Sequence, residues 1–223
     1  MFAFAYRPYV AIIGDVRDSR LLENRGAVQE QLKSVLTKIN RLYAEDISAK
    51  FMITLGDEFQ GLLGTGKNAI QIVEYIQREM YPVEIRFGLG IGEITTEINA
   101  EMAIGADGPG YYCARNAIEY LKDNEGRKRN VVCDVRIEIE GDYRQEERLL
   151  NTVLSLMTVI RREQTDRQRE IIKAFEECDG SQKDCAGYLN ISQPSVQRNL
   201  NAGNYYEYRS AMDTITKILE EIK

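Results

Sequence analysis

Two aspartates stand where short apolar segments of this chain end, and their chemistry is its first functional clue. Asp15 closes the apolar run from Tyr9 to Gly14, and Asp57 lies in an acidic turn between two apolar runs that together span residues 51–63. Two carboxylates that converge form a hard, oxygen-rich site suited to Mg²⁺ or Mn²⁺, and through the metal to nucleotide phosphates. Each motif alone is also common turn chemistry, because Gly-Asp favours tight turns and strands often end in Asp.

The order of the surrounding elements predicts that these two aspartates meet. Residue periodicity indicates a strand at Tyr9–Asp15, an amphipathic helix at Leu21–Tyr43, the acidic hairpin, a helix at Asn68–Met80 and a strand at Val83–Ile94. Strand, helix, hairpin, helix and strand make the split βαβ arrangement of ferredoxin-like and palm domains. The first strand and the hairpin are neighbours in that topology. We therefore predict an α/β fold of this type, with a further helix at Ala114–Lys122 and a strand at Val131–Ile139.

Four segments resemble the successive signatures of class III nucleotidyl cyclases: AIIGD, LGDEFQ, IRFGLGIGEI and GADGPGYYCARNAIEYL. Diguanylate cyclases of the GGDEF type are more distant relatives. The cyclase resemblance covers roughly Tyr9–Ile139. The whole chain most resembles the SatD family, in which a cyclase-like palm domain precedes a helix-turn-helix. The resemblance implies that Asp15 and Asp57 hold two metal ions, and that Arg115 helps to hold the nucleotide triphosphate.

The chain also departs from the cyclase pattern. Tyr111 stands where cyclases place an asparagine, and Ile53 where they place a base-selecting lysine. After Asp15, polar residues replace the small apolar ones: Arg17 and Arg20 are candidate phosphate contacts, and Asp18 is a candidate metal ligand. A solvated turn is the alternative for these three. We therefore expect binding of a metal–nucleotide rather than cyclisation.

Composition narrows the chemistry further. The 223 residues are 43% hydrophobic and 29% charged, which suits one medium domain and one small domain. The chain has no histidine, which excludes Ser-His and Cys-His catalysis and disfavours transition metals. Its four cysteines form no CxxC pair and are expected to be reduced, buried thiols. The apolar N-terminus is short and interrupted by Arg7 and Pro8, so we expect a cytoplasmic protein without a membrane partner.

We expect two domains: a cyclase-like palm domain with a connecting helix at residues 1–162, and a helix-turn-helix domain at 163–223. The connecting helix is predicted at Glu146–Arg162. Its apolar side is formed by Leu149, Leu150, Val153, Leu154, Met157 and Ile160. Packing against the palm sheet is the favoured role, because the helix is shorter than three heptads. The alternative is a seam that pairs two protomers into a homodimer.

The last sixty residues show the pattern of a helix-turn-helix. A helix at Gln168–Cys178 follows the N-cap candidate Thr165, and a second short helix follows Ser181. Ser192 begins the third, in which Val196 and Leu200 point inward. The outward face then carries Gln193, Ser195, Gln197, Arg198, Asn199 and Asn201. Gln, Asn and Arg can form bidentate contacts with base edges in the major groove, so we predict DNA binding.

Charge opposes that prediction. Residues 163–223 carry eight Lys or Arg against eleven Asp or Glu. Affinity for DNA without regard to sequence comes largely from cations that contact phosphate, so binding requires a local patch. Lys183, Arg198 and Arg209 are the candidates for that patch. The alternative is that the three helices mediate protein contacts.

Three functional interpretations follow. The favoured one is a two-domain regulator that binds a metal–nucleotide and DNA. The second is an active nucleotidyl cyclase or nucleotidyltransferase that uses two-metal chemistry. The third is a protein-interaction scaffold with a vestigial pocket.

Overall fold

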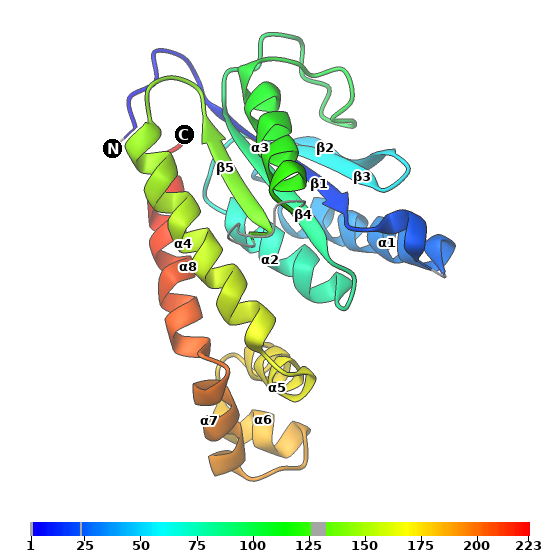
Figure 1. Ribbon diagram of the computed structural model, residues 1–223, viewed down its shortest axis with the longest axis vertical. Coiled ribbons are helices and arrows are strands. Elements are labelled where there is room, and N and C mark those ends of the chain that lie inside the picture. Colours follow the sequence, from blue (N-terminus) through cyan, green and yellow to red (C-terminus); the bar gives the residue numbers. More distant parts are fainter. Residues whose placement is uncertain (1, 23, 126–132) are drawn as a thin grey trace. The chain divides into compact units, whose positions relative to one another are not determined.

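The computed structural model describes residues 2–22, 24–125 and 133–223, and it contains one five-stranded sheet (Figure 1). The strands are β1 (Tyr9–Val16), β2 (Ile47–Leu55), β3 (Glu58–Leu63), β4 (Ile85–Gly92) and β5 (Val135–Ile139). Their spatial order is β2-β3-β1-β4-β5, in which β4 and β5 are parallel and the other neighbours antiparallel. This is the split βαβ order, extended by one strand, and it confirms the predicted fold class.

The described chain divides into two compact units. One, the sheet unit, comprises residues 1–155 and 215–223; the other, the helical unit, comprises residues 156–214. Helices α4 (Arg144–Glu163) and α8 (Tyr205–Leu219) contribute residues to both. The contact division therefore differs from the domain boundary predicted at residues 162 and 163, because the end of α8 belongs to the sheet unit. There Gln71 donates a hydrogen bond to the Thr216 hydroxyl at 3.0 Å.

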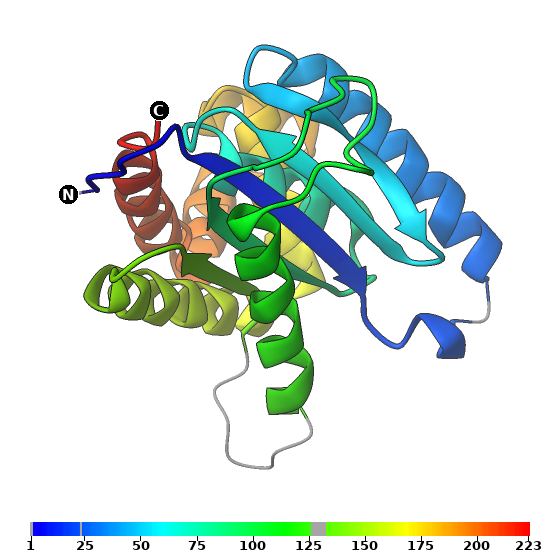
Figure 2. The ribbon, with the colours of Figure 1, turned by 90° about the horizontal axis from the view of Figure 1, so that it is seen from above.

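Both faces of the sheet are covered by helices. Figure 2 shows α3 (Pro109–Glu125) on one face and α1 (Arg25–Leu42) on the other, where α1 also packs against α2 (Ala69–Met80). On the α3 face, Ala11 and Ile13 of β1 form a core cluster with Ala114 and Ile118 of α3. Because both faces are buried, β1 is apolar along nearly its whole length.

Alternate glycines on β4 bring α3 close to the sheet. A Cβ atom at Gly90 would lie 1.9 Å from the Gly110 carbonyl oxygen, and one at Gly88 would lie 2.2 Å from the Ala114 carbonyl oxygen. Only glycine permits this approach of helix backbone to strand backbone. Arg86 is the preceding residue on the same face of β4, so it is the first position where a long side chain can extend beneath the end of α3.

Most element predictions are confirmed, with boundaries that differ at the ends. The helix predicted from Leu21 begins at Arg25, after a short 3-10 helix at Ser19–Leu21, and the strand predicted at Val83–Ile94 is β4. The last predicted strand of the sheet, Val131–Ile139, is β5; residues 131 and 132 lie outside the described residues. No described helix is long and apolar enough to cross a membrane.

The helical unit contains the predicted helix-turn-helix. Its helices α5 (Asp166–Glu177), α6 (Gln182–Tyr188) and α7 (Gln193–Ala202) share a core formed by Ile171, Ala174, Phe175, Cys185, Ala186, Val196 and Leu200. Thr165 is the N-cap of α5 in a reciprocal capping box with Gln168. Val196 and Leu200 are fully buried, as their spacing predicts.

Two predictions of burial are wrong in part. Leu149, expected on the apolar side of α4, is 66% exposed, whereas Leu150 and Leu154 are buried. Adjacent residues lie about 100° apart around a helix, and in α4 this rotation places Leu149 on the solvent side of the buried stripe that contains Leu150 and Leu154. Only Cys185 is a buried cysteine; Cys113, Cys133 and Cys178 are half-buried, and all four are free thiols. Pairing of protomers through α4 stays a prediction.

Candidate functional site

The end of β1 adjoins the tip of the β2–β3 hairpin, which places the two predicted aspartates on neighbouring elements. Asp15 pairs with Glu58 across β1 and β3, and the Val16 amide donates a hydrogen bond to the Asp57 carbonyl oxygen at 3.2 Å. Within residues 2–22, 24–125 and 133–223, however, no group of three or more acidic or cysteine side chains is arranged to hold a metal ion.

Both carboxylate oxygens of Asp15 are engaged by cations of the protein. Arg86 Nη1 lies 2.5 Å from Oδ2, and Lys122 Nζ lies 2.8 Å from Oδ1. Arg86 also donates to Glu125 from Nε, at 2.8 Å, and from Nη2. Burial lowers the pKa of Arg86, but its hydrogen bonds with Glu125 and Asp15 outweigh burial and raise the pKa. Asp15 is therefore a buried carboxylate with two internal counter-ions.

Arg17 belongs to the same set of charges. Its Nη2 lies 2.8 Å from Oδ1 of Asp134, which is 1% exposed, and 3.0 Å from Oε1 of Glu125. The alternative of a solvated turn is therefore wrong for Arg17. Asp18 and Arg20 are exposed, and Asp18 has a left-handed backbone with φ 47° before the 3-10 helix.

The hairpin contributes Glu58 to the face that carries Asp15. Residues paired directly across antiparallel strands point to the same face, so Asp15, Glu58 and Arg86 all lie on the α3 side. Arg115 of α3 covers Glu58, with 2.6 Å between Nη1 and Oε2. The sequence offered a signal for Lys122, because it follows Arg115 by seven residues, two helical turns, and so shares its face.

Together these residues form a set that we call the charged network. Four cations and four carboxylates compose it: Arg17, Arg86, Arg115 and Lys122 with Asp15, Glu58, Glu125 and Asp134. It is partly buried, and at its edge Arg17 Nη1 also lies 3.6 Å from Oε2 of the more exposed Glu84. An incoming metal ion must compete with Lys122 and Arg86 for Asp15, and an incoming phosphate must compete with Glu58 for Arg115.

Tyr111, at the position of the cyclase asparagine, is a core residue. It packs in the cluster with Ala11, Leu62 and Ala103 and is 7% exposed. Burial raises the pKa of its hydroxyl, which has no hydrogen-bond partner among the described residues. The Tyr111 side chain therefore belongs to the core of the sheet unit.

Helix α7 presents its predicted face, and part of it is already held by hydrogen bonds. Gln193, Arg198 and Asn201 are exposed, as is Lys183 of α6, whereas Ser195, Gln197 and Asn199 are half-buried. Gln182, the first residue of α6, donates to Oε1 of Gln197, and Gln197 donates to Oδ1 of Asn201 at 2.8 Å. Gln182 also accepts from Gln193 at 3.5 Å.

Two of the predicted contacts have partners within the helical unit. Asn199 donates its amide to the Ser195 carbonyl oxygen at 2.8 Å. Arg209, predicted for the cationic patch, lies 3.7 Å from Glu176. The exposed cations that remain near the α7 face are Lys183 and Arg198. Gln182 was not among the residues predicted for this face, although its place at the start of α6 matches that of Gln193 at the start of α7.

These observations define a protein with a palm-type sheet unit and a helix-turn-helix. The model of the SatD family matches residues 9–218. The chain therefore belongs to the SatD family. No curated protein matches it.

Solved structures similar to this chain include two guanylyl cyclases. One is the catalytic core of a rhodopsin-guanylyl cyclase with converted specificity in complex with ATPαS, at 17% identity and TM-score 0.37, covering 50% of this chain and 71% of that chain. The other is the guanylyl cyclase Cya2, at 17% identity and TM-score 0.31, covering 51% and 70%. A regulator of polyketide synthase expression from Bifidobacterium adolescentis is similar over 97% of this chain and 86% of its own, at 11% identity and TM-score 0.27.

Proposed function

We propose that this protein is a regulator whose helix-turn-helix binds DNA and whose sheet unit binds a metal–nucleotide. The observation that carries the proposal is the outward face of α7. Its apolar residues Val196 and Leu200 are buried, while its amide side chains lie side by side and are oriented by Gln182. Side chains that are already ordered lose less conformational entropy when they bind, which favours this face as a recognition surface.

In this proposal α7 enters the major groove. Arg198 is the best candidate for a bidentate contact with guanine, because it is an exposed arginine on this face, and Gln193 and Gln197 are candidates for adenine. Lys183 supplies a phosphate contact. The net negative charge of residues 163–223 predicts weak binding to DNA of random sequence.

Selection of binding sites from random duplex DNA with the full chain tests this function. We expect Arg198→Ala to weaken the selected site by about 1–3 kcal/mol and to relax preference at one base pair. Arg167→Ala removes the same charge from α5, where Arg167 pairs with Glu170, and is the matched control. The proposal fails if no sequence is enriched, or if both variants lose affinity equally.

The sheet unit supplies the candidate ligand site at the end of β1. Asp15, Asp57 and Asp18 are the carboxylates proposed to hold Mg²⁺ or Mn²⁺, and a bound metal would neutralise nucleotide phosphates there. Arg115 and Arg20 are the proposed phosphate partners. The side chain of Arg115 is 42% exposed, and Arg20 is an exposed residue. Arg17 is the third proposed phosphate partner, and it contacts Asp134 and Glu125 in the charged network. A metal ion can bind Asp15 only if it displaces Lys122 from that carboxylate.

That exchange gives a sharp test. Calorimetry with nucleoside triphosphates, with and without Mg²⁺, should show metal-dependent binding that Asp57→Asn and Asp15→Asn weaken. Lys122→Met should instead strengthen Mg²⁺ binding, because it removes a competitor for Asp15. Metal independence, or weaker Mg²⁺ binding by Lys122→Met, would exclude this site.

The competing function is turnover by the same residues, as a nucleotidyl cyclase or nucleotidyltransferase with two-metal chemistry. Tyr111 in the core and the apolar Ile53 argue against it, because neither supplies the polar group expected for catalysis or base selection. A product assay on the same samples separates the two. Nucleotide should also change DNA affinity in the regulator, and DNA must then change nucleotide affinity by the same factor. Absence of both activities favours the scaffold.

A further inference from the structure

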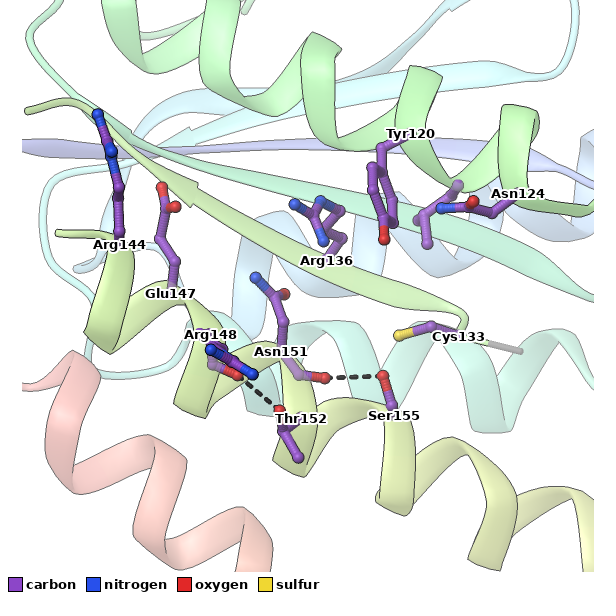
Figure 3. Close-up of a pocket in the computed structure, with 11 residues that line it drawn as sticks. Tyr120, Asn124, Cys133, Arg136, Arg144, Glu147, Arg148, Asn151, Thr152 and Ser155 are labelled. Atoms are coloured by element: carbon purple, nitrogen blue, oxygen red, sulfur yellow. Dashed lines mark hydrogen bonds between the residues drawn. The ribbon is translucent and has the colours of Figure 1, made fainter. Parts of the chain in front are cut away.

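A cavity lies in the sheet unit, between α3, β5 and the first turns of α4 (Figure 3). Its volume is about 470 Å³, within the range of pockets that hold small molecules. None of the eight residues of the charged network lines it. Three of its lining residues are arginines: Arg136 comes from β5, and Arg144 and Arg148 come from α4.

Arg136 is held in place at this cavity. Its guanidinium carbon lies 3.6 Å from the centre of the Tyr120 ring, and its Nε lies 3.1 Å from Oε1 of Glu138. Within the described residues, no hydrogen bond engages its two terminal nitrogens. In Figure 3 the guanidinium lies between Tyr120 and Asn151. A planar guanidinium fixed in this way presents a fork of donors that matches the two oxygens of a carboxylate or phosphate.

The opposite wall is rigid, because α4 is bound to the edge of β5. Asn151 accepts from the Ile137 amide and donates to the Ile137 carbonyl oxygen, each at 2.8 Å, and Glu147 accepts from the Ile139 amide at 2.6 Å. Glu147 is the sole acidic residue among the described residues that line the cavity, and one of its oxygens is committed to the strand.

The remaining arginines are available to a ligand. Arg144 and Arg148 are four residues apart on α4, so they lie on one side of the helix. Arg148 is exposed, and the one ion pair of Arg144 among the described residues is an exposed contact of 3.4 Å with Asp142. Exposed ion pairs of this kind contribute little and exchange readily. The cavity thus offers three guanidinium groups in a protein whose net charge is −6.

We propose that this cavity binds a small organic oxyanion, a phosphate ester or a carboxylate, independently of any metal. Arg136 holds the oxyanion through its donor fork, and Arg148 and Arg144 add charge from α4. The volume exceeds that of phosphate alone, so the ligand carries an organic part. Tyr120, which is 49% exposed, and Leu121 supply the apolar part of the lining that this organic part can contact.

Calorimetry of the full chain in phosphate-free buffer tests the proposal with phenyl phosphate, benzoate and inorganic phosphate as probes. We expect one-to-one binding at millimolar concentrations or below, with phenyl phosphate tighter than inorganic phosphate. Comparison of phenyl phosphate with benzoate then identifies the oxyanion. Arg136→Gln should weaken binding roughly ten- to hundredfold, as expected for lost hydrogen bonds to a charged group. Arg136→Lys, which retains the charge without the fork, should lose most of this affinity.

Controls keep the result interpretable. Arg41→Gln removes an exposed arginine from α1 and should leave binding unchanged. Addition of Mg²⁺ should leave the binding of phenyl phosphate unchanged, which separates this cavity from the proposed metal–nucleotide site. If Arg136→Gln does not fold, the exposed Arg148→Gln replaces it, with at least a threefold loss expected. The proposal is overturned if no probe saturates, or if the arginine variants of the cavity bind as tightly as Arg41→Gln.

Discussion

Arg86→Met tests the central link of the charged network. The side chains of Arg86 and Asp15 are each only 11% exposed, and Arg86 also holds Glu125. Removal of one partner from a buried ion pair typically costs about 3–5 kcal/mol, because the other charge stays buried. Lys122 remains 2.8 Å from Asp15 and Arg17 remains 3.0 Å from Glu125, so we expect the low end, about 3 kcal/mol.

Lys122→Met is the matched comparison. Its side chain is 43% exposed and Arg86 still neutralises Asp15, so the expected loss is about 1 kcal/mol or less. Urea unfolding followed by circular dichroism measures both variants, and the pair Asp15→Asn with Arg86→Met in a double-mutant cycle should show coupling of about 1–3 kcal/mol. Arg86 is not the central link of the charged network if Arg86→Met is within about 1 kcal/mol of wild type, or if Lys122→Met is the costlier change.

Three further predictions concern packing, ionisation and capping. Gly90→Ala should destabilise the sheet unit by about 3 kcal/mol or more, because its Cβ would meet the α3 backbone at 1.9 Å. Gly187→Ala has open space around it and should be neutral or stabilising. Thermal unfolding measures both variants. Burial, with nearby glutamates, raises the pKa of the Cys113 thiol from 9.0 to about 11, so its alkylation should rise with a midpoint near 11 by mass spectrometry. The folded state holds the Cys113 proton more tightly than the unfolded chain does. The stability that Cys113 contributes is therefore complete below the unfolded pKa and is lost as pH rises toward 11. An alkylation midpoint near 9 would contradict the raised pKa. Thr165→Ala should cost about 0.5–2 kcal/mol in the helical unit, with Thr165→Ser as the conservative control that retains the cap.

The sequence by itself determined the elements and their order. Apolar spacing of two and of about 3.6 residues is local information. It therefore predicted the strands and helices of the sheet unit and the three helices of the helix-turn-helix, including the inward Val196 and Leu200 of α7. The split βαβ order then placed Asp15 beside the hairpin, because few topologies accommodate those elements.

Only the tertiary structure decided which charges meet. Asp15 and Arg86 face each other because of the register between β1 and β4, and Arg17 reaches Asp134 across 117 residues of sequence. Register and the depth of α3 above the glycines of β4 are set by packing of the whole sheet, which no local spacing encodes. The arginine-lined cavity arises in the same way, where α3, β5 and α4 meet.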